Sequence, residues 1–441
     1  MASLITTCPT CTTPETCDCF GSVASSMALA RNAIQRASSS SALTYNILPK
    51  VVEIQSSLVA QRRHLHAYPE LSYKEINTVQ YLKQQVLKIS EETGVHFEIE
   101  EGVDGTTGMW VDLTLGTGEG ERICLRADMD ALPILEAGDA SYKSKNMGVH
   151  HACGHDCHMA ILLGAIKILA AEKETLQGKV RFLFQPAEEG GGGAIRMIKG
   201  GCLNDQTRIF GLHVWNFMEA GLIGIAPGPI TAYSDRIFID IVGAGGHGSM
   251  PQGTVDAVLV AAHLVVALHS GVVSRSVNPF EAVALTVGRI EGGEVANAIA
   301  GRATLKGTVR TRNAKTKSTV VRRIQEICTG VGVTFGAEIK LEYRDGYPAT
   351  ISSERGAADV TEAALPIVGV ENIVPPHPTL AGEDMSYYLN EIDGAFFFVG
   401  SAKDVDNVVP HHRADFDVDE KCLSVGASVM VNLIRNLCRK G

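Results

Sequence analysis

The sequence of 441 residues predicts an α/β fold in which a central, mainly parallel sheet is flanked by helices, with a smaller α+β domain inserted into the chain. In the first half, short apolar or β-branched runs alternate with helical stretches, which is typical of a parallel sheet. Between residues 231 and 345 the expected order becomes strand, helix, strand, strand, helix, strand, as in a ferredoxin-like unit. Hydrophobic residues make up 45% of the chain, and this excludes global disorder.

The first domain is predicted over residues 46–230 and 346–441, so it is discontinuous in sequence. Apolar spacing predicts helical structure over 51–86, with a break at Tyr68-Pro69. A helix is expected over 160–172. Strands before the insert are expected at 96–99, 109–115, 123–126, 179–184 and 208–214, and the segment after it carries a helix at 354–365 and a strand at 395–400.

The inserted domain is predicted over residues 231–345. Its expected strands are 235–242, 282–290, 303–310 and 337–343, and its expected helices are 254–270 and 316–330. This order predicts one sheet with both helices on one face. The apolar run 257–273 is shorter than a membrane-spanning helix, so it is expected to be a buried helix, and no membrane span is expected.

Residues 1–45 differ from the rest of the chain, because they are rich in Ser and Thr and contain no Lys. We expect a flexible N-terminal extension. An organelle-targeting segment is an alternative, supported by Arg31 and Arg36 on a helical stretch. A small metal knuckle is a weaker one, since no second CxxC completes a zinc pattern. The cysteines concerned are Cys8, Cys11, Cys17 and Cys19.

Charge and cysteine content limit the partners and the compartment. Lys and Arg number 39 and Asp and Glu 49, and the net charge of −10 argues against nucleic acid as a partner. The 11 cysteines are odd in number, and no apolar N-terminal signal region precedes them, so reduced thiols are expected. These features together predict a cytoplasmic protein.

Side chains that can bind metals follow several predicted strands directly. Asp128 and Asp130 follow the strand at 123–126, the pair Glu188-Glu189 follows the strand at 179–184, and His213 ends the strand at 208–214. Each residue alone is also compatible with a structural role. Because sites in open α/β sheets form at the carboxyl ends of strands, these segments are expected to converge.

The number of candidate ligands favours two ions over one. Cys153, His155, Glu189 and His213 already fill a tetrahedral zinc site, and His411-His412 adds a fifth ligand. Two adjacent Glu residues at a strand end point to different sides, so one can bind an ion while Glu188 faces water as general base. Divalent ions lower the pKa of bound water, which allows attack on a carbonyl at neutral pH.

A series of motifs in order identifies a resemblance that covers roughly residues 50 to 430. The motifs are Arg62-Arg63-His64-Leu65-His66 with Pro69-Glu70-Leu71, Arg126-Ala127-Asp128-Met129-Asp130-Ala131-Leu132-Pro133, His151-Ala152-Cys153-Gly154-His155-Asp156, Gln185-Pro186-Ala187-Glu188-Glu189-Gly190, Gly211-Leu212-His213, Gly246-His247-Gly248-Ser249-Met250-Pro251 and Gly382-Glu383-Asp384. The chain resembles the dinuclear metal amidohydrolase family of N-acyl-amino-acid amidohydrolases, hippurate hydrolases and plant auxin–amino acid conjugate hydrolases. The resemblance implies a dizinc-exopeptidase-like fold in which residues 231–345 act as a lid and dimerisation domain.

The resemblance also implies a ligand set and a cofactor. The expected metal ligands are Cys153, His155, Glu189, His213 and His412, with Cys153 shared by two divalent ions. Zinc or manganese is expected, with cobalt and nickel as alternatives; the thiolate favours zinc. His411 is a rival for the last ligand, because the segment His411-His412-Arg413-Ala414 departs from the family's usual Leu-His followed by Pro.

Further roles follow from the same resemblance. Glu188 is the expected general acid and base, and Asp130 the carboxylate that orients the metal site, while Asp128 is taken as structural. His247 is expected to stabilise the oxyanion, on lid closure or from a partner subunit. Asn297 and Arg310 are expected to hold the substrate carboxylate; for Arg310 a surface charge is the alternative.

The predicted activity is metal-dependent cleavage of the amide bond of N-acyl amino acids, such as N-acetyl, N-benzoyl or indole-acyl conjugates. The partners expected are this small-molecule substrate and a second copy of the chain. One alternative is a dipeptidase or exopeptidase of the same wider family. A metal-binding regulatory protein without catalysis is a second, and the intact Glu188 argues against it. A Cys/His thiol hydrolase is disfavoured, because Cys153 and His155 are better used as ligands.

Overall fold

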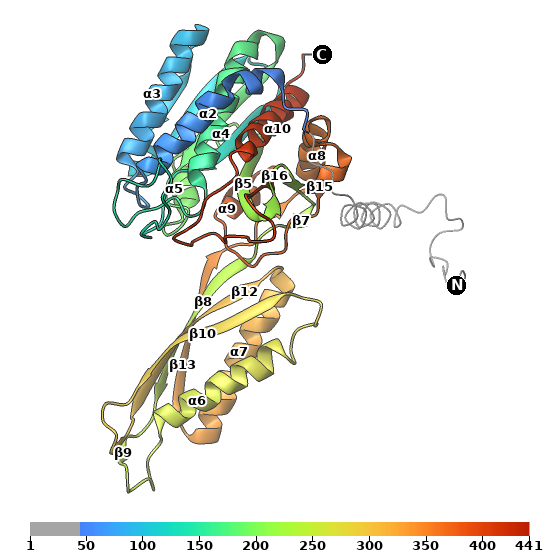
Figure 1. Ribbon diagram of the computed structural model, residues 1–441. Helices are drawn as coiled ribbons and strands as arrows, with labels where there is room; N and C mark the ends of the chain where they lie inside the picture. Colours follow the sequence, from blue (N-terminus) through green and yellow to red (C-terminus); the bar gives the residue numbers. More distant parts are fainter. Residues whose placement is uncertain (1–44, 441) are drawn as a thin grey trace, which may run out of the picture.

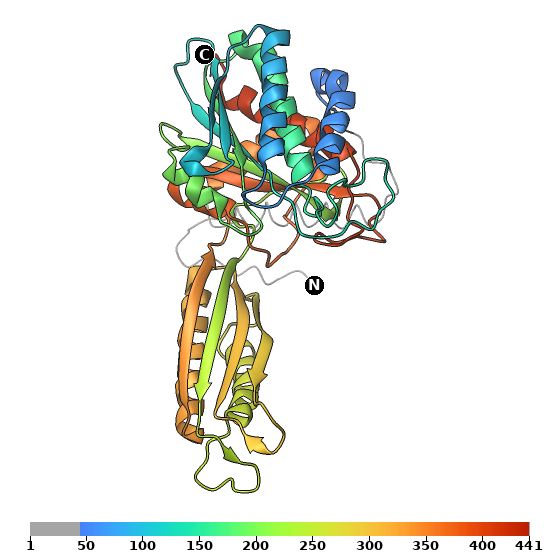
Figure 2. The same ribbon diagram turned by 90° about the vertical axis from the view of Figure 1, so that its left-hand side faces the viewer.

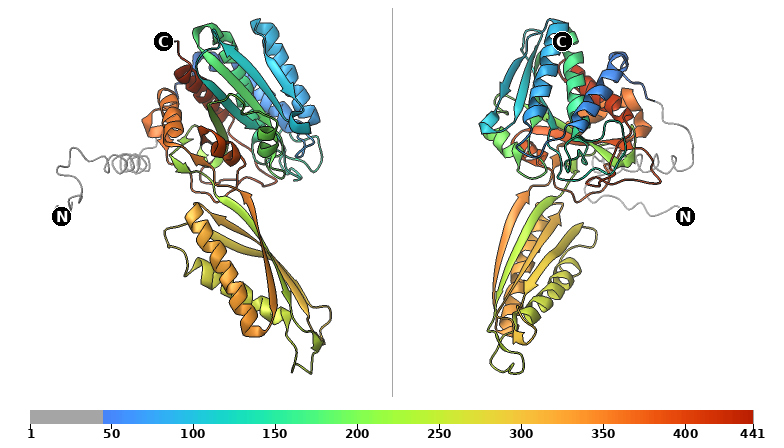
Figure 3. Two further views of the ribbon diagram at one scale, coloured as in Figure 1. Left: turned by 180° about the vertical axis from the view of Figure 1, so that it is seen from behind. Right: turned by 60° about the vertical axis from the view of Figure 1, so that its left-hand side comes forward.

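The computed structural model describes residues 45–440, which form two bodies joined by two chain segments (Figure 1). The predictions for Cys8, Cys11, Cys17 and Cys19 and for the rest of residues 1–44 lie outside this range. The first body contains both ends of the described chain, and the second is an elongated domain formed by the middle of the sequence (Figures 1 and 3). The chain leaves and re-enters the first body near the short pair β7 (Gly228–Pro229) and β14 (Ile351–Ser352).

The first body is built on an eight-stranded sheet with the order β1-β2-β4-β3-β5-β16-β6-β15. Its central strands β4, β3, β5 and β16 are parallel, while β1 pairs antiparallel with β2, β2 with β4, and β6 with β16. The predicted α/β fold is confirmed. The strands are β1 (Glu98–Glu101), β2 (Met109–Leu115), β3 (Arg122–Asp128), β4 (Gly178–Gln185), β5 (Arg208–Glu219), β6 (Ile223–Gly224), β15 (Ile373–Val374) and β16 (Asp393–Ala402).

Helices cover both faces of this sheet. Successive residues of a strand point to opposite faces, and in the central strands both sets are apolar, so both faces are buried against helices. On one face Phe182, Phe210 and Phe397 belong to the main core with the long helices, and on the other Leu183 and Phe396 pack near α5 and α9. The long helices are α2 (Pro49–Ala67), α3 (Ile76–Thr93), α4 (His155–Glu172), α8 (Glu354–Val368) and α10 (Lys421–Leu437). The short ones are α5 (Gly193–Lys199) and α9 (Met385–Glu391).

The second body has the predicted order of elements. Its sheet is β10-β12-β8-β13, fully antiparallel, and both helices lie on one side of it (Figure 2). The inward-facing Ile237, Ile239 and Ile241 belong to its separate core. The elements are β8 (Tyr233–Val242), α6 (Ala257–Leu268), β10 (Val283–Gly292), β12 (Arg302–Thr311), α7 (Ala314–Phe335) and β13 (Glu338–Tyr347). Among residues 45–440, no helix combines the length and the apolar character needed to cross a membrane.

The main local difference from the sequence prediction lies at the start of α4. The sequence predicts this helix from residue 160, but it begins at His155, directly after Gly154 in the left-handed conformation (φ 90°). Hydrophobic periodicity does not predict this first turn, because its residues His155, Asp156 and His158 are polar although they are buried. The turn matters, since it places His155 and the preceding Cys153 at the end of a rigid element.

Candidate metal centre and active site

A cavity of about 850 Å³ opens at the carboxyl edge of the central parallel strands. Cys153, Glu188, Glu189, His213 and His412 line it. The predicted convergence of these segments at one sheet edge is therefore observed, as expected for ligand sites of open α/β sheets. The second body contributes to the same cavity through Ser234, Arg236, Arg310, Arg344 and Tyr347.

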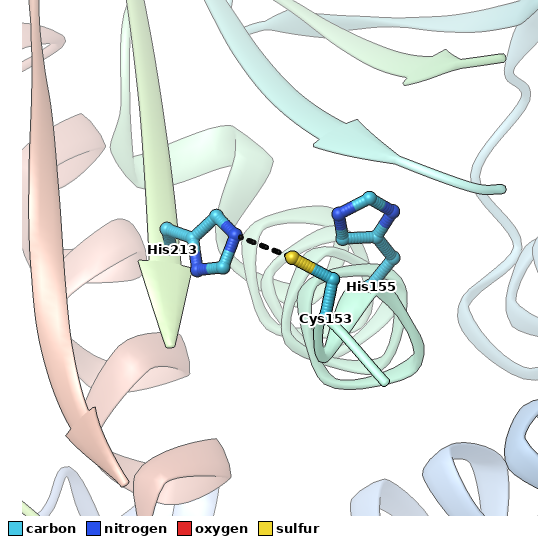
Figure 4. Close-up of side chains that lie close together, drawn as sticks. All are labelled: Cys153, His155 and His213. Atoms are coloured by element: carbon cyan, nitrogen blue, oxygen red, sulfur yellow. Dashed lines mark hydrogen bonds between the residues drawn. The ribbon is translucent and has the colours of Figure 1, made fainter. Parts of the chain in front are cut away.

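Cys153, His155 and His213 form the inner part of this cluster (Figure 4). The Sγ atom of Cys153 lies 3.4 Å from Nε2 of His213. Nδ1 of His213 lies 2.6 Å from the carbonyl oxygen of Val214, and Nδ1 of His155 lies 2.8 Å from that of Asp130. Because a carbonyl oxygen only accepts, both Nδ1 atoms donate, and in the neutral rings the lone pair available to a metal ion is on Nε2. Metal-binding histidines are commonly oriented in this way.

Glu189 and His412 form the outer part of the cluster together with Cys153. Nε2 of His412 lies 3.1 Å from Oε1 of Glu189, and the backbone N–H of His412 donates to the carbonyl of Ala152 at 2.8 Å. The candidate ligands therefore fall into two overlapping groups, Cys153-His155-His213 and Cys153-Glu189-His412. Cys153 belongs to both.

His411, the rival of His412, has other contacts. Its Nε2 donates to the carbonyl of Val214 at 3.0 Å, and its ring stacks on Trp215 with 4.7 Å between centroids. Burial lowers the pKa of His411 to about 3, so the ring is neutral. The structure thus brings His412, and not His411, to Glu189.

The Glu pair lies on a turn after β4 and not at the end of the strand, where the sequence predicts it. Ala187 adopts φ 55° there, and Asp130 holds the turn. The two carboxylate oxygens of Asp130 accept the N–H groups of Glu188 (2.9 Å) and Glu189 (3.1 Å). The Ser72 hydroxyl also donates to the Asp130 carboxylate, at 2.6 Å. Asp130 therefore orients both glutamates and, through its backbone carbonyl, His155.

Glu188 is buried, with 6% of its surface exposed. Burial, and next the charge of Glu383, raise the pKa of Glu188 well above its ordinary value. Burial also raises the pKa of Glu383 to about 7, against the lowering effect of Arg126. A raised pKa of this kind suits a carboxyl group that takes up and returns a proton.

Three buried residues around the cluster have no role in the sequence analysis. Arg126 bonds to Asp128 at 2.7 Å and lies 3.1 Å from Glu383, which lines the cavity, and 2.9 Å from Asp384, so it places a positive charge among these acids. Glu383 and Asp384 are part of a recognised motif, but no spacing rule connects them to Arg126, which is far away in the chain. Only folding brings these groups together.

His158 is a further residue that the sequence analysis missed. Its Nδ1 donates to Asp128 Oδ1 at 2.6 Å, and its Nε2 accepts the N–H of Val214 at 2.9 Å. Asp128 is thereby fixed between Arg126 and His158, with one oxygen 3.6 Å from Nε2 of His155. His158 belongs to the run of His, Cys and Asp over residues 150–158, but the helix predicted from residue 160 does not include it, so its position one turn after His155 was known only from the structure.

The electrostatics of the cluster fit divalent cations. Burial acts to lower the pKa of His155, but Asp128, Asp130 and Glu189 together raise it to about 10. Burial and the charge of Glu189 raise the pKa of the Cys153 thiol well above its ordinary value. Nε2 of His155 is buried and has no hydrogen-bond partner within residues 45–440. A negative field around an unpartnered imidazole nitrogen and a thiol is suited to metal ions, which deprotonate their ligands.

The predicted lid residues are divided between two places. Arg310 lines the cavity, half-buried, and its Nη1 lies 3.3 Å from the carbonyl of Asp235 and 3.4 Å from that of Val309. His247 and Asn297 are exposed at the far end of the second body, near β9 (Gly246–His247) in Figure 1. There the Ser249 hydroxyl bonds to Nδ1 of His247 at 2.8 Å, and the Asn297 carbonyl accepts the N–H of Gly248 at 2.8 Å. One chain in this arrangement does not bring them to Cys153.

Residues 124–436 match a family model described as peptidase family M20/M25/M40. Three curated relatives align over most of the chain. The chain is 38% identical over 370 residues to N-acetyl-L-cysteine deacetylase of Bacillus subtilis (strain 168), covering 84% of this chain and 85% of the relative. It is 35% identical over 382 residues to thermostable carboxypeptidase 1 of Saccharolobus solfataricus, covering 86% and 94%. It is also 35% identical over 381 residues to IAA-amino acid hydrolase ILR1-like 4 of Arabidopsis thaliana, covering 85% and 84%.

A solved structure is similar over nearly its whole length. The Bacillus subtilis YXEP protein, described as a dinuclear metal binding peptidase from the M20 family, superposes with a TM-score of 0.75 at 28% sequence identity. The alignment covers 88% of this chain and 99% of that chain. The two-body architecture is therefore shared with this protein.

Proposed function

Because the chain belongs to peptidase family M20/M25/M40, we propose that it is a metal-dependent amidohydrolase that cleaves N-acyl amino acids to a carboxylic acid and a free amino acid. Two of its relatives carry names of enzymes that act on such compounds. The observation that carries the proposal is the cavity that brings together Glu188, the two ligand groups around Cys153, and Arg310.

Cys153, His155 and His213 would hold one divalent ion, and Cys153, Glu189 and His412 a second. The relative described as dinuclear supports two ions. Zinc is the metal we expect first because of the thiolate, with manganese next and cobalt or nickel as alternatives. Bound ions would polarise the amide carbonyl and make water more acidic.

The proton transfers are assigned to Glu188. Its carboxylate takes a proton from the attacking water and returns it to the leaving amine nitrogen, so that no free amide anion leaves. Asp130 keeps the Glu188 backbone in place through its hydrogen bond to the N–H. The Tyr347 hydroxyl donates to the carbonyl of Glu188 at 2.7 Å, which connects the same turn to β13 of the second body.

The substrate carboxylate is assigned to Arg310. Its guanidinium lines the cavity, and within residues 45–440 it makes only long bonds to backbone carbonyls, so donors remain for a carboxylate. Burial lowers the pKa of Arg310, because the charged guanidinium has lost part of its hydration. A negatively charged partner such as a carboxylate would stabilise this charge. This arrangement favours substrates with a free α-carboxylate.

His247 is assigned to the oxyanion and Asn297 to the substrate carboxylate, and each acts in the cavity of the partner chain. Both lie at the far end of the second body, so we propose a homodimer through the lid domain, residues 231–345, in which each chain completes the partner's cavity. Mixing Glu188→Gln with His247→Ala chains tests this. Heterodimers would hold one intact site, and activity should recover to about a quarter of the wild-type value. No recovery after subunit exchange would contradict the trans arrangement.

A substrate panel tests the activity itself. The chain is stripped with a chelator, reloaded with zinc, manganese or cobalt, and assayed on N-acetyl, N-benzoyl and indole-acyl amino acids and on free dipeptides. We expect hydrolysis of the acyl amino acids. Preferred cleavage of peptides would favour the second candidate, a peptidase, which the 35% identity to a thermostable carboxypeptidase supports. Turnover in the continued presence of chelator would contradict both. The cytoplasmic location expected from the sequence stays a prediction.

A further inference from the structure

A second cluster of metal-binding side chains lies outside the cavity just described. His66 comes from α2, Glu136 from the loop after β3, and His150 from the segment that precedes the Cys153 turn. All three are buried, with exposed fractions of 0%, 7% and 0%. One ligand atom of each lies within 4.8 Å of the other two.

His66 is oriented as metal-binding histidines usually are. Its Nδ1 lies 2.7 Å from Oδ2 of Asp156, an acceptor, so Nδ1 donates. The guanidinium Nη2 of Arg62 also lies 3.3 Å from Nδ1, but Arg62 has its own acceptors in Asp156 (2.8 Å) and Asp417 (2.7 Å). Nε2 of His66 is therefore directed at Oε1 of Glu136, 3.3 Å away. A carboxylate that holds the outer nitrogen of a histidine is a common support of a bound metal.

His150 supplies an independent observation. Both its ring nitrogens are buried and have no hydrogen-bond partner among the residues that the structure describes. Its backbone is fixed by a reciprocal pair of 3.0 Å hydrogen bonds with Leu132, and its ring lies 5.2 Å from that of His66. A buried imidazole without partners is unfavourable, so a ligand bound by this ring would account for its position.

Glu136 completes the donor set. Its Oε2 accepts the N–H of Ser144 at 2.7 Å, which leaves Oε1 facing Nε2 of His66. Two imidazoles and one carboxylate are ligands that zinc accepts in tetrahedral geometry, with water in the fourth position. A proton on His66 would satisfy the contact to Glu136, but it would leave His150 without a partner.

We propose that His66, Glu136 and His150 bind a Zn²⁺ ion that is separate from the catalytic ions. The site joins α2, the loop after β3 and the segment leading to Cys153. The ion is structural, because none of the three residues lines the active-site cavity. It tethers the loop of residues 131–150, which precedes the catalytic ligands in the chain.

The experiment compares bound zinc per chain, by elemental analysis after gel filtration, in the wild type, His150→Leu and Glu136→Gln. Each variant is expected to hold one zinc ion fewer than the wild type. The control His64→Leu, on the same helix as His66 with its ring stacked on Tyr81, should hold the wild-type number. The result is the difference in zinc per chain between a variant and the wild type, so it does not depend on how many ions the catalytic cavity holds or on any activity. Equal zinc content in the wild type and His150→Leu would overturn the proposal.

Thermal melting provides a second readout that guards against misfolding. His150 has no side-chain hydrogen bond to lose within the described residues, so in chelator the Tm of His150→Leu should equal or exceed that of the wild type. Added zinc should raise the Tm of the variant less than that of the wild type, since one binding site is gone. An equal rise in both proteins would refute the third site, and a protonated His66 between Asp156 and Glu136 would then explain the cluster.

Discussion

Replacing Glu188 with Gln separates proton transfer from metal binding. The amide has nearly the same shape as the carboxylate but cannot accept and return a proton. Glu188 sits on a turn that Asp130 holds through backbone N–H groups, so the substitution leaves those hydrogen bonds in place. The proposed ligand on this turn is Glu189, and we expect the bound metal to remain near the wild-type amount.

The expected loss of rate follows from the role of Glu188 in two steps. General acid–base catalysis contributes about 10²- to 10⁴-fold, or roughly 3 to 5 kcal/mol of barrier. Because the same group serves the attacking water and the leaving amine, we expect kcat to fall by about 10⁴-fold, the upper end of that range. KM should change little, since Arg310 and the ligand groups are untouched.

The effect on stability has a definite sign. Burial, with Glu383 next, raises the pKa of Glu188 above its unfolded value, so the folded metal-free chain binds its proton more tightly than the unfolded chain does. Stability from this group is present below the unfolded pKa of about 4.3 and is lost as pH rises toward the folded pKa. The Glu188→Gln substitution removes that loss, and the metal-free variant should melt higher than the wild type at pH 8 but not at pH 4.

The assay combines kcat on an N-acyl amino acid, elemental analysis and melting in chelator. Glu189→Gln is the matched control, because it changes the neighbouring carboxylate and should lose metal as well as activity. Retention of most activity by Glu188→Gln would refute its assignment as general base. Loss of metal equal to that of Glu189→Gln would show that Glu188 is a ligand instead.

Three other predictions follow from the same geometry. His412→Ala should lower metal content and kcat, whereas His411→Ala should keep the metal, because His411 bonds to a backbone carbonyl; the reverse result would make His411 the ligand. Arg310→Ala should raise KM about 10- to 100-fold for acyl amino acids and much less for their amides, and an equal rise for both would exclude a carboxylate contact. Burial acts to raise the pKa of Asp417, but Arg62 lowers it below the ordinary value, so its stabilising contribution is present above about pH 4 and is lost as pH falls further. Asp417→Asn should therefore lower the free energy of unfolding by about 1–3 kcal/mol at pH 7 and by less at pH 3 in urea titrations; an equal loss at both pH values would contradict this.

Most of the elements could be predicted from hydrophobic periodicity, because strands buried on both faces and amphipathic helices leave clear patterns. The turn that starts α4 could not, since His155 and His158 are polar residues in a buried position. The short helices α5 and α9 were hidden for a different reason, because their few residues give no periodic signal. Polar residues that are buried for a functional reason contradict the pattern on which such predictions depend.

The sequence by itself determined the α/β class, the ferredoxin-like insert and the residue types of a metal site, because these depend on local periodicity and on motifs within a few residues. The tertiary structure alone decided which groups meet. It placed His412 beside Glu189, brought Arg126 to Glu383 in the cavity wall, separated His247 from Cys153, and gathered His66, Glu136 and His150 into a second cluster. Distances between residues hundreds of positions apart depend on strand order and chain crossing, which no local pattern of residues records.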